Sequence, residues 1–233
     1  MPTRKLKKKY RKTKRQMGEN VKIPKKPEHP MTQFITTHHD NKYLLVFTNK
    51  NQHLVDTENI YIKCFLEKML EILRSSFNRE KEYHKKLGNY HENYEHSIDN
   101  ILMNLKKTNY LTFVATDENI VPISYLHIEI RENDYDKMWT VCTNPKNRGQ
   151  GYSSFVVKNT LKHQKRNNRR KLLLEVYNDD TIERLGEETR QETIMNHFQN
   201  HGFIETNRNN LSSYTRSNLL SDSGETKIMT CNL

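Results

Sequence analysis

Two glycines in one short loop, Gly149 and Gly151, lie between an apolar run typical of a strand and a run typical of a helix. Glycine allows the left-handed backbone conformations that a tight turn needs. The first amide groups of a helix have no partner within the helix, and they lie at its positive end. Backbone amides from Arg148 to Ser153 would then converge on an anion with little help from side chains. The loop therefore predicts a site for a phosphorylated cofactor, and a plain strand-to-helix turn is the alternative interpretation.

Two common nucleotide-binding patterns do not fit this loop. A dinucleotide site has a further glycine three residues after the second one, but Ser154 occupies that position and several strands precede the loop. A Walker loop has a lysine directly after its last glycine, whereas Gly151 is followed by Tyr152. The loop is therefore typical of neither class.

Short apolar runs rich in strand-forming residues lie on both sides of the loop, and they predict strands at 43–47, 110–116, 120–130, 137–142, 171–177 and 227–232. A short Asp-Glu-Asn segment separates the second and third of these runs, which predicts an antiparallel hairpin. Apolar residues at helical spacing predict helices within 56–77, about 98–107, from the loop to about 166, and through 194–202. This order indicates an α/β fold with a mixed sheet and helices on its faces.

The positive charge of the chain is confined to its N-terminus. Residues 1–27 hold 12 Lys and Arg and one acidic residue, Glu19, whereas the other 206 residues hold 27 basic and 27 acidic side chains. The first 30 residues also contain closely spaced prolines and few bulky apolar residues, so we expect a disordered basic arm over 1–30 and one folded domain over 31–233. The arm is either a solubility or targeting tail, or a segment that contacts nucleic acid or an acidic partner.

Several classes of protein do not fit the sequence. No apolar run approaches the ~20 residues of a membrane span, and the N-terminus lacks the apolar core of a secretory signal. The three cysteines are odd in number and far apart, which favours a reducing compartment over a disulfide framework. His84, His91 and His96 do not have the spacing of metal ligands. We therefore expect an intracellular protein of the cytoplasm or nucleus, with no metal and no membrane partner.

The loop and its surroundings resemble the GCN5-related N-acetyltransferase (GNAT) family, whose members transfer acetyl groups from acetyl-CoA to amines. The segment Arg148-Gly149-Gln150-Gly151-Tyr152-Ser153 fits the acetyl-CoA loop of that family. A strand, then Asn178, then a helix ending at Gly202-Phe203 follow as in the family. The resemblance spans about residues 40–233 and is strongest at 138–204. It implies a mostly antiparallel sheet of six to seven strands, about four helices, a cofactor-binding core at about 110–204, and acetyl-CoA as cosubstrate.

The resemblance also implies where the cofactor binds. The strands before and after the loop would run parallel and splay apart, and the pantetheine arm would enter the gap beside the backbone of Cys142 and Thr143. The pyrophosphate would bind to Arg148, Gly149, Gln150, Gly151, Tyr152 and Ser153. Asn178 is similar in position to the residue that holds the cofactor arm, and a turn residue at the end of a strand is the alternative.

The catalytic residues are less well defined. Many family members protonate the departing thiolate with a tyrosine four residues before the Gly-Phe pair, and Phe198 occupies that position here. Tyr177 and Tyr152 are alternative proton donors. The candidates for a base on or beside the central strands are Glu129, Asp134, Asp136 and Glu175. His197 and His201, which flank Phe198, are expected at the surface, and Cys142 is expected to be a buried, unreactive thiol.

The expected activity is direct transfer of an acetyl group from acetyl-CoA to a primary amine of a protein, peptide or small molecule. An acidic insertion within 178–193 would favour a cationic acceptor, and a solvated polar loop is the alternative. If Phe198 means that the chemistry has been lost, the protein is a catalytically impaired binding module whose basic arm contacts nucleic acid or an acidic partner.

Overall fold

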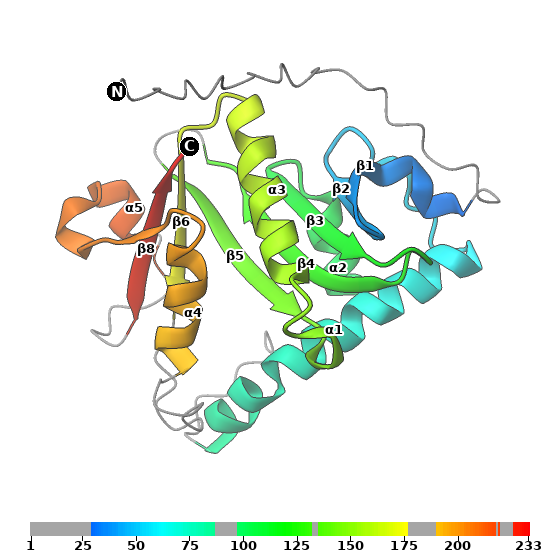
Figure 1. The fold of residues 1–233 in the computed structure, drawn as a ribbon, viewed down its shortest axis with the longest axis horizontal. Coiled ribbons are helices and arrows are strands. Elements are labelled where there is room, and N and C mark those ends of the chain that lie inside the picture. Colours follow the sequence, from blue (N-terminus) through cyan, green and yellow to red (C-terminus); the bar gives the residue numbers. More distant parts are fainter. Residues whose placement is uncertain (1–28, 87–96, 132–134, 177–189, 218, 220–225) are drawn as a thin grey trace, which may run out of the picture.

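The computed structural model describes residues 29–86, 97–131, 135–176, 190–217, 219 and 226–233 (Figure 1). These residues form an eight-stranded sheet in the order β1-β2-β3-β4-β5-β6-β8-β7. The strands are β1 (Ile35–His39), β2 (Lys42–Phe47), β3 (Tyr110–Thr116), β4 (Pro122–Glu129), β5 (Asp136–Thr143), β6 (Lys171–Val176), β7 (Ile204–Glu205) and β8 (Lys227–Asn232). The helices are α1 (Ile60–Lys86), α2 (Ile98–Lys106), α3 (Tyr152–Arg166), α4 (Arg190–Gln199) and α5 (Ser213–Ser217).

The sheet separates two helical layers, each with its own apolar core. Side chains of a strand alternate between the two faces of a sheet, so neighbours such as Leu44 and Leu45 of β2 belong to different cores. Val156 of α3 and Phe198 of α4 pack on one face, and Leu66 of α1 packs on the other. Figure 1 shows α3 and α4 in front of the sheet and α1 behind it. The loop between β5 and α3 leads from the end of β5 into α3, and its turn at Pro145–Asn147 also contacts α1.

β5 and β6 pair in parallel, and every other pair of neighbouring strands in the described part of the chain is antiparallel. The parallel pair is also short. The pairing covers Asp136 to Met138 of β5 and Leu172 to Leu174 of β6, although β5 continues to Thr143. β5 meanwhile stays paired with β4 up to Thr143. Beyond Met138 the two parallel strands therefore diverge, as Figure 1 shows.

The α/β fold class with its mixed, mostly antiparallel sheet is confirmed, as is the hairpin of β3 and β4. The prediction that the second strand of this hairpin begins at Ile120 is wrong. The Asp117 carboxylate accepts hydrogen bonds from the amides of Asn119 and Val121, which forms a turn, and β4 begins at Pro122.

The sheet also has more strands than the six to seven expected. The sequence did not predict β1 and β7, because β1 is largely polar and β7 has two residues, both exposed. Most of the predicted basic arm, residues 1–28, lies outside the described residues. In the described part of the chain, no helix is both long enough and apolar enough to cross a membrane.

Candidate functional site

The divergence of β5 and β6 leaves one edge of β5 without a strand partner among the described residues. The five residues from Trp139 to Thr143 extend over about 16 Å at the ~3.3 Å rise per residue of a parallel strand. Backbone amides and carbonyls on such an edge need partners when they are buried. An extended ligand that enters the gap can supply them.

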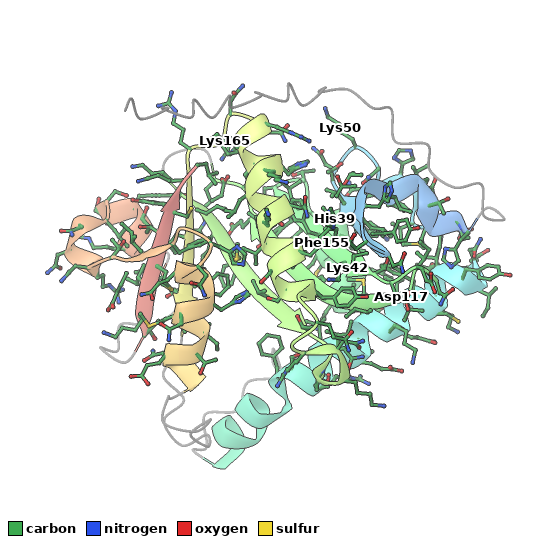
Figure 2. The ribbon with its side chains drawn as sticks, viewed as in Figure 1. His39, Lys42, Lys50, Asp117, Phe155 and Lys165 are labelled. Carbon is green, nitrogen blue, oxygen red and sulfur yellow. The ribbon has the colours of Figure 1, made fainter. Side chains whose placement is uncertain are left out.

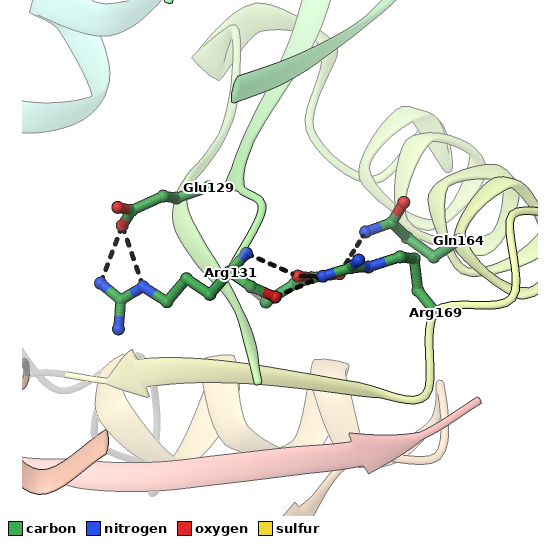
Figure 3. A network of polar contacts seen from close by, with 5 residues as sticks. Glu129, Arg131, Gln164 and Arg169 are labelled. Carbon is green, nitrogen blue, oxygen red and sulfur yellow. Dashed lines mark hydrogen bonds and ion pairs between the residues drawn. The ribbon is translucent and has the colours of Figure 1, made fainter. Parts of the chain in front are cut away.

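A buried carboxylate stabilises the end of the β5 and β6 pair at which the two strands are hydrogen-bonded, Asp136 to Met138 of β5. We call this the closed end, and the end beyond Met138 the open end. Asp136 accepts hydrogen bonds from the Arg169 guanidinium at 2.8 Å, from Gln164 Nε2 at 3.0 Å and from the amide of Arg131 at 2.9 Å (Figure 3). Its side chain is 1% exposed. Because all of these contacts serve the carboxylate of Asp136, this residue is a structural anchor of β5 and not a free base. The sequence had included Asp136 among the candidate bases.

Two further candidate bases, Glu129 and Glu175, are both engaged in ion pairs. Glu129 Oε2 accepts from the Arg131 guanidinium at 2.7 Å and from the Trp139 indole at 2.9 Å. Glu175 lies 2.5 Å from the ammonium of Lys137, and both of these side chains are at most 3% exposed. Burial lowers the pKa of Lys137, and the Glu175 carboxylate opposes this effect. Glu175 follows the last paired residue of β6 and so lies where the strands begin to diverge.

A cleft of about 740 Å³ opens at the divergent ends of the strands. Its walls come from α1, from β5, from the loop after β5, from the first turn of α3, and from α4. Phe77, Val141, Ile194 and Phe198 give it an apolar part, and the loop and the first turn of α3 give it a polar part. A cleft with one apolar and one polar end suits a ligand with a slender apolar arm and an anionic head.

The loop between β5 and α3 presents backbone amides to the polar end of the cleft. Gly149 and Gly151 both have a φ of 77°, a left-handed conformation that favours glycine. Gly151 is the N-cap of α3, and its lack of a side chain leaves the first turn without a side-chain cap. In the described residues, the amides of Gly151 to Ser154 make no hydrogen bond. Open amides at a helix N-terminus form an anion-binding site, as the loop pattern predicted.

Two positively charged side chains, Arg148 and Lys42, lie near these amides. Arg148 is the one permanently charged side chain among the described residues that line the cleft, and those residues include no carboxylate. Lys42 of β2, which is labelled in Figure 2, donates a hydrogen bond of 2.9 Å to the carbonyl of Gln150, and its Nζ lies 5.0 Å from the centre of the Tyr152 ring. Sequence reasoning missed Lys42, and no local signal could have found a contact between residues 108 positions apart.

The wall formed by α4 includes a second residue that sequence reasoning placed elsewhere. His197, expected at the surface, is half-buried and lines the cleft, and its Nε2 lies 2.9 Å from Ser153 Oγ in the first turn of α3. Burial, and then the nearby His201, lower the pKa of His197. Phe198, at the position where the resemblance leads to the expectation of a tyrosine, lines the same cleft and packs edge-on against Phe203.

Cys142 and Thr143 line the cleft from the end of β5. Burial raises the pKa of Cys142 to about 12, so its thiol stays protonated near neutral pH. The hydroxyl of Ser124 donates a hydrogen bond to the Cys142 carbonyl and also contacts the hydroxyl of Thr143 at 2.9 Å. These contacts fix the end of β5 from the β4 side.

Most of the predicted cofactor residues come together in this one cleft. Its lining includes Cys142, Thr143, Arg148, Gly149, Gly151, Tyr152 and Ser153. Gln150 is exposed and does not line the cleft, although its carbonyl is held by Lys42. Two predicted residues, Tyr177 and Asn178, lie outside the described residues, as does Asp134.

The fold is similar to that of several solved acetyltransferases. An acetyltransferase from Streptococcus agalactiae 2603 matches with a TM-score of 0.56 and 12% identity, over 84% of this chain and 100% of that chain. A GNAT-family acetyltransferase from Staphylococcus aureus Mu50 matches with a TM-score of 0.54 and 13% identity, over 82% and 99%. The PaiA N-acetyltransferase from Thermoplasma acidophilum, solved in complex with coenzyme A, gives 0.52 and 12%, also over 82% and 99%.

Comparison at the level of sequence gives no such likeness. No protein-family model and no curated protein sequence matches the chain. At identities of 12–13%, the structural matches establish the fold and leave the activity to be argued from the site. The expectation drawn from the loop and its flanking elements is thereby confirmed at that level: this chain has the fold of the GCN5-related N-acetyltransferases.

Proposed function

We propose that the protein is an acetyl-CoA-dependent N-acetyltransferase that moves the acetyl group directly to a primary amine. The observation that carries this proposal is the cleft beside the divergent end of β5, which joins the open amides of α3 to the unpaired edge of β5. The fold supports it, because similar structures are those of acetyltransferases and one of them contains coenzyme A. The chemical class of the amine stays open among proteins, peptides and small molecules.

In this proposal each part of the cleft binds one part of the cofactor. The pyrophosphate binds to the amides between Arg148 and Ser153, with the Arg148 guanidinium as its charged partner. The pantetheine arm lies along β5 and forms hydrogen bonds with the backbone near Cys142 and Thr143. Asn178 holds the arm from the β6 side, as the resemblance to the GNAT family implies.

Direct transfer places modest demands on the side chains. The neutral amine attacks the thioester carbonyl, so that the C–N bond forms and the C–S bond breaks. The amine loses one proton and the departing thiolate gains one, so no net proton is released. Positioning of the two reactants supplies much of the rate enhancement. None of the described candidate bases lines the cleft, and Glu175 is the one closest to the point where the strands diverge, because it follows the last residue of β6 that pairs with β5. Tyr177 stays a candidate acid.

The test is acetyl-CoA turnover against a panel of peptides and polyamines, comparing the natural chain with Gly151→Trp. The substitution places a large side chain in the left-handed N-cap of α3, beside Lys42 Nζ at 3.6 Å from the position of a Cβ. We expect thiol release to fall at least tenfold, together with a lower thermal midpoint without ligand, because the left-handed φ of 77° strains any residue other than glycine by about 1–2 kcal/mol. Equal turnover by the two proteins would show that the cofactor binds elsewhere.

Phe198 favours a second candidate function, a binding module that holds coenzyme A without turnover. A phenyl ring lines the cleft where a phenol would donate a proton, and it packs against Phe203. Acetyl-CoA and coenzyme A should raise the thermal midpoint under both hypotheses, because a ligand of the native state stabilises it. Thiol release on no member of the amine panel would favour the binding module. A gain of turnover in Phe198→Tyr would show that a proton donor was the missing part.

A further inference from the structure

A hydrogen bond links α4 to the first turn of α3 across the mouth of the cleft. His197 Nε2 and Ser153 Oγ are 2.9 Å apart, and both side chains line the cleft. Ser153 is the second residue of α3, so its hydroxyl lies among the open amides of the helix N-terminus. The imidazole is therefore one hydrogen bond away from the place that the proposed function assigns to the pyrophosphate.

Among the described residues, the surroundings of His197 contain little that would stabilise a positive charge. The titratable or charged groups near it are His201 on its own helix, Lys158 of α3 beside His201, and Arg148, Tyr152 and Cys142 in the cleft lining. None of the described lining residues is a carboxylate, and the segments of α1 and β5 in the lining add no other ionisable group. With respect to the described residues that line the cleft, an anion that enters would be the first negative charge close to this imidazole.

We propose that His197 is a cofactor-binding residue that takes up a proton when coenzyme A binds and then supports the pyrophosphate together with Ser153. The inference rests on the proposed function, because it requires the pyrophosphate at the N-terminus of α3. In the free protein, burial and His201 lower the pKa of His197, so the imidazole is neutral at neutral pH. Both ring nitrogens of the protonated form are donors, so it can keep its contact with Ser153 and offer its remaining N–H to a phosphate oxygen.

The sign of the pH dependence follows from linkage. A bound pyrophosphate favours the imidazolium, so the pKa of His197 is higher in the complex than in the free protein. Binding then takes up a proton, and the affinity for the cofactor increases as the pH falls from the bound pKa toward the free one. Serine takes part as a relay, because its hydroxyl can accept from the imidazolium and donate to the phosphate.

The experiment measures the dissociation constant of 3′-dephospho-coenzyme A by calorimetry between pH 5.5 and 8 on the full chain. This probe keeps the pyrophosphate and lacks the terminal phosphate, whose own titration near pH 6 would obscure the result. We expect the natural protein to bind about tenfold more tightly at pH 5.5 than at pH 8, since uptake of one proton allows up to tenfold per pH unit. His197→Gln should bind with little pH dependence, because glutamine forms hydrogen bonds but does not titrate.

His201→Gln is the matched control, since it removes the neighbouring imidazole on the same helix, which does not line the cleft. It should keep the pH dependence. An NMR titration of the imidazole signal that disappears in His197→Gln gives an independent readout, and its pKa should rise when the probe is added. Unchanged pH dependence in His197→Gln, or an unchanged pKa, would overturn the inference and leave the cofactor site standing. Failure of the natural protein to bind the probe or coenzyme A at any pH would instead overturn the proposed function.

Discussion

The two ends of the β5 and β6 pair use their polar groups in opposite ways. At the closed end, Asp136 is surrounded by donors from Arg131, Gln164 and Arg169 (Figure 3). The Lys137 ammonium also pairs there with the Glu175 carboxylate. At the open end, the edge of β5 and the first amides of α3 have no partner among the described residues. The polar side chains at the closed end therefore have partners, whereas the backbone groups at the open end have none among the described residues.

This difference indicates how the fold keeps a gap in its sheet. Two parallel strands that separate lose backbone hydrogen bonds, and the loss must be offset elsewhere. The closed end supplies contacts that hold β5 against β6 and α3, so the strands can diverge only beyond Met138. Substitutions at the closed end should therefore affect folding, and substitutions at the open end should affect ligand binding.

The largest effect is expected from Asp136→Asn. Removing this charge leaves the partly buried Arg169 guanidinium without its carboxylate, and breaking a buried pair from one side costs about 4 kcal/mol of unfolding free energy. Urea denaturation followed by circular dichroism measures it. Glu205→Gln is the control, because Glu205 pairs with Lys227 at a position where both side chains are more than 40% exposed. It should cost less than about 1 kcal/mol, and equal losses in the two variants would contradict the anchoring role of Asp136.

A slightly smaller effect is expected for the second pair of the closed end. Lys137→Met alone should cost about 3 kcal/mol of unfolding free energy, because it leaves the buried Glu175 carboxylate without its closest cation. The double variant Lys137→Met/Glu175→Leu should recover most of this loss, since an apolar pair can replace a buried ion pair. If Glu175 also acts as the base, the double variant folds but loses turnover. Additive losses in the double variant would show that the pair itself is not what holds the strands.

The closed end was also the part that the sequence predicted least well. Alternating and continuous apolar runs identified β3, β4, β6 and β8, because burial of a strand face shows directly in residue type. Charged residues on strands usually face water, so residue type alone does not predict a buried Glu175. The structure buries it, because the parallel register places its carboxylate beside the Lys137 ammonium. The partner of a buried charge depends on register, and register cannot be read from either strand alone.

At the open end, in contrast, the sequence predicted the binding loop but not the side chains that support it. The loop between Arg148 and Ser153 was predicted because its chemistry is carried by the backbone, and glycine positions reveal backbone conformation. Its supports were missed because each comes from a distant segment. Lys42 is 108 positions from Gln150, and His197 is 44 positions from Ser153. Which face of α4 meets α3 depends on packing, so the pattern of α4 alone could not place His197 in the cleft.

At the open end we expect Arg148→Gln to weaken the binding of coenzyme A about tenfold, or about 1.4 kcal/mol. The free energy of unfolding should change by less than about 0.5 kcal/mol, because the side chain is exposed. Calorimetry at constant salt gives the dissociation constant. Lys146→Gln is the matched control, since it removes an exposed positive charge of the same loop that does not line the cleft. If both variants weaken the binding of coenzyme A equally, Arg148 contributes only as one positive charge near the loop and not through a specific contact.

The smallest effect is expected from Lys42→Met, which tests whether a side chain from β2 shapes the loop. The Lys42 ammonium holds the Gln150 carbonyl and lies over the Tyr152 ring, so its loss should let the loop move and weaken coenzyme A binding about threefold, or about 0.65 kcal/mol. Lys50→Met is the control, because Lys50 is an exposed lysine in the turn after β2 (Figure 2). A threefold loss confined to Lys42→Met means that the loop needs a partner outside its own sequence. If the natural protein, Lys42→Met and Lys50→Met bind coenzyme A with equal affinity, Gly149 and Gly151 alone determine the backbone conformation of the anion-binding loop.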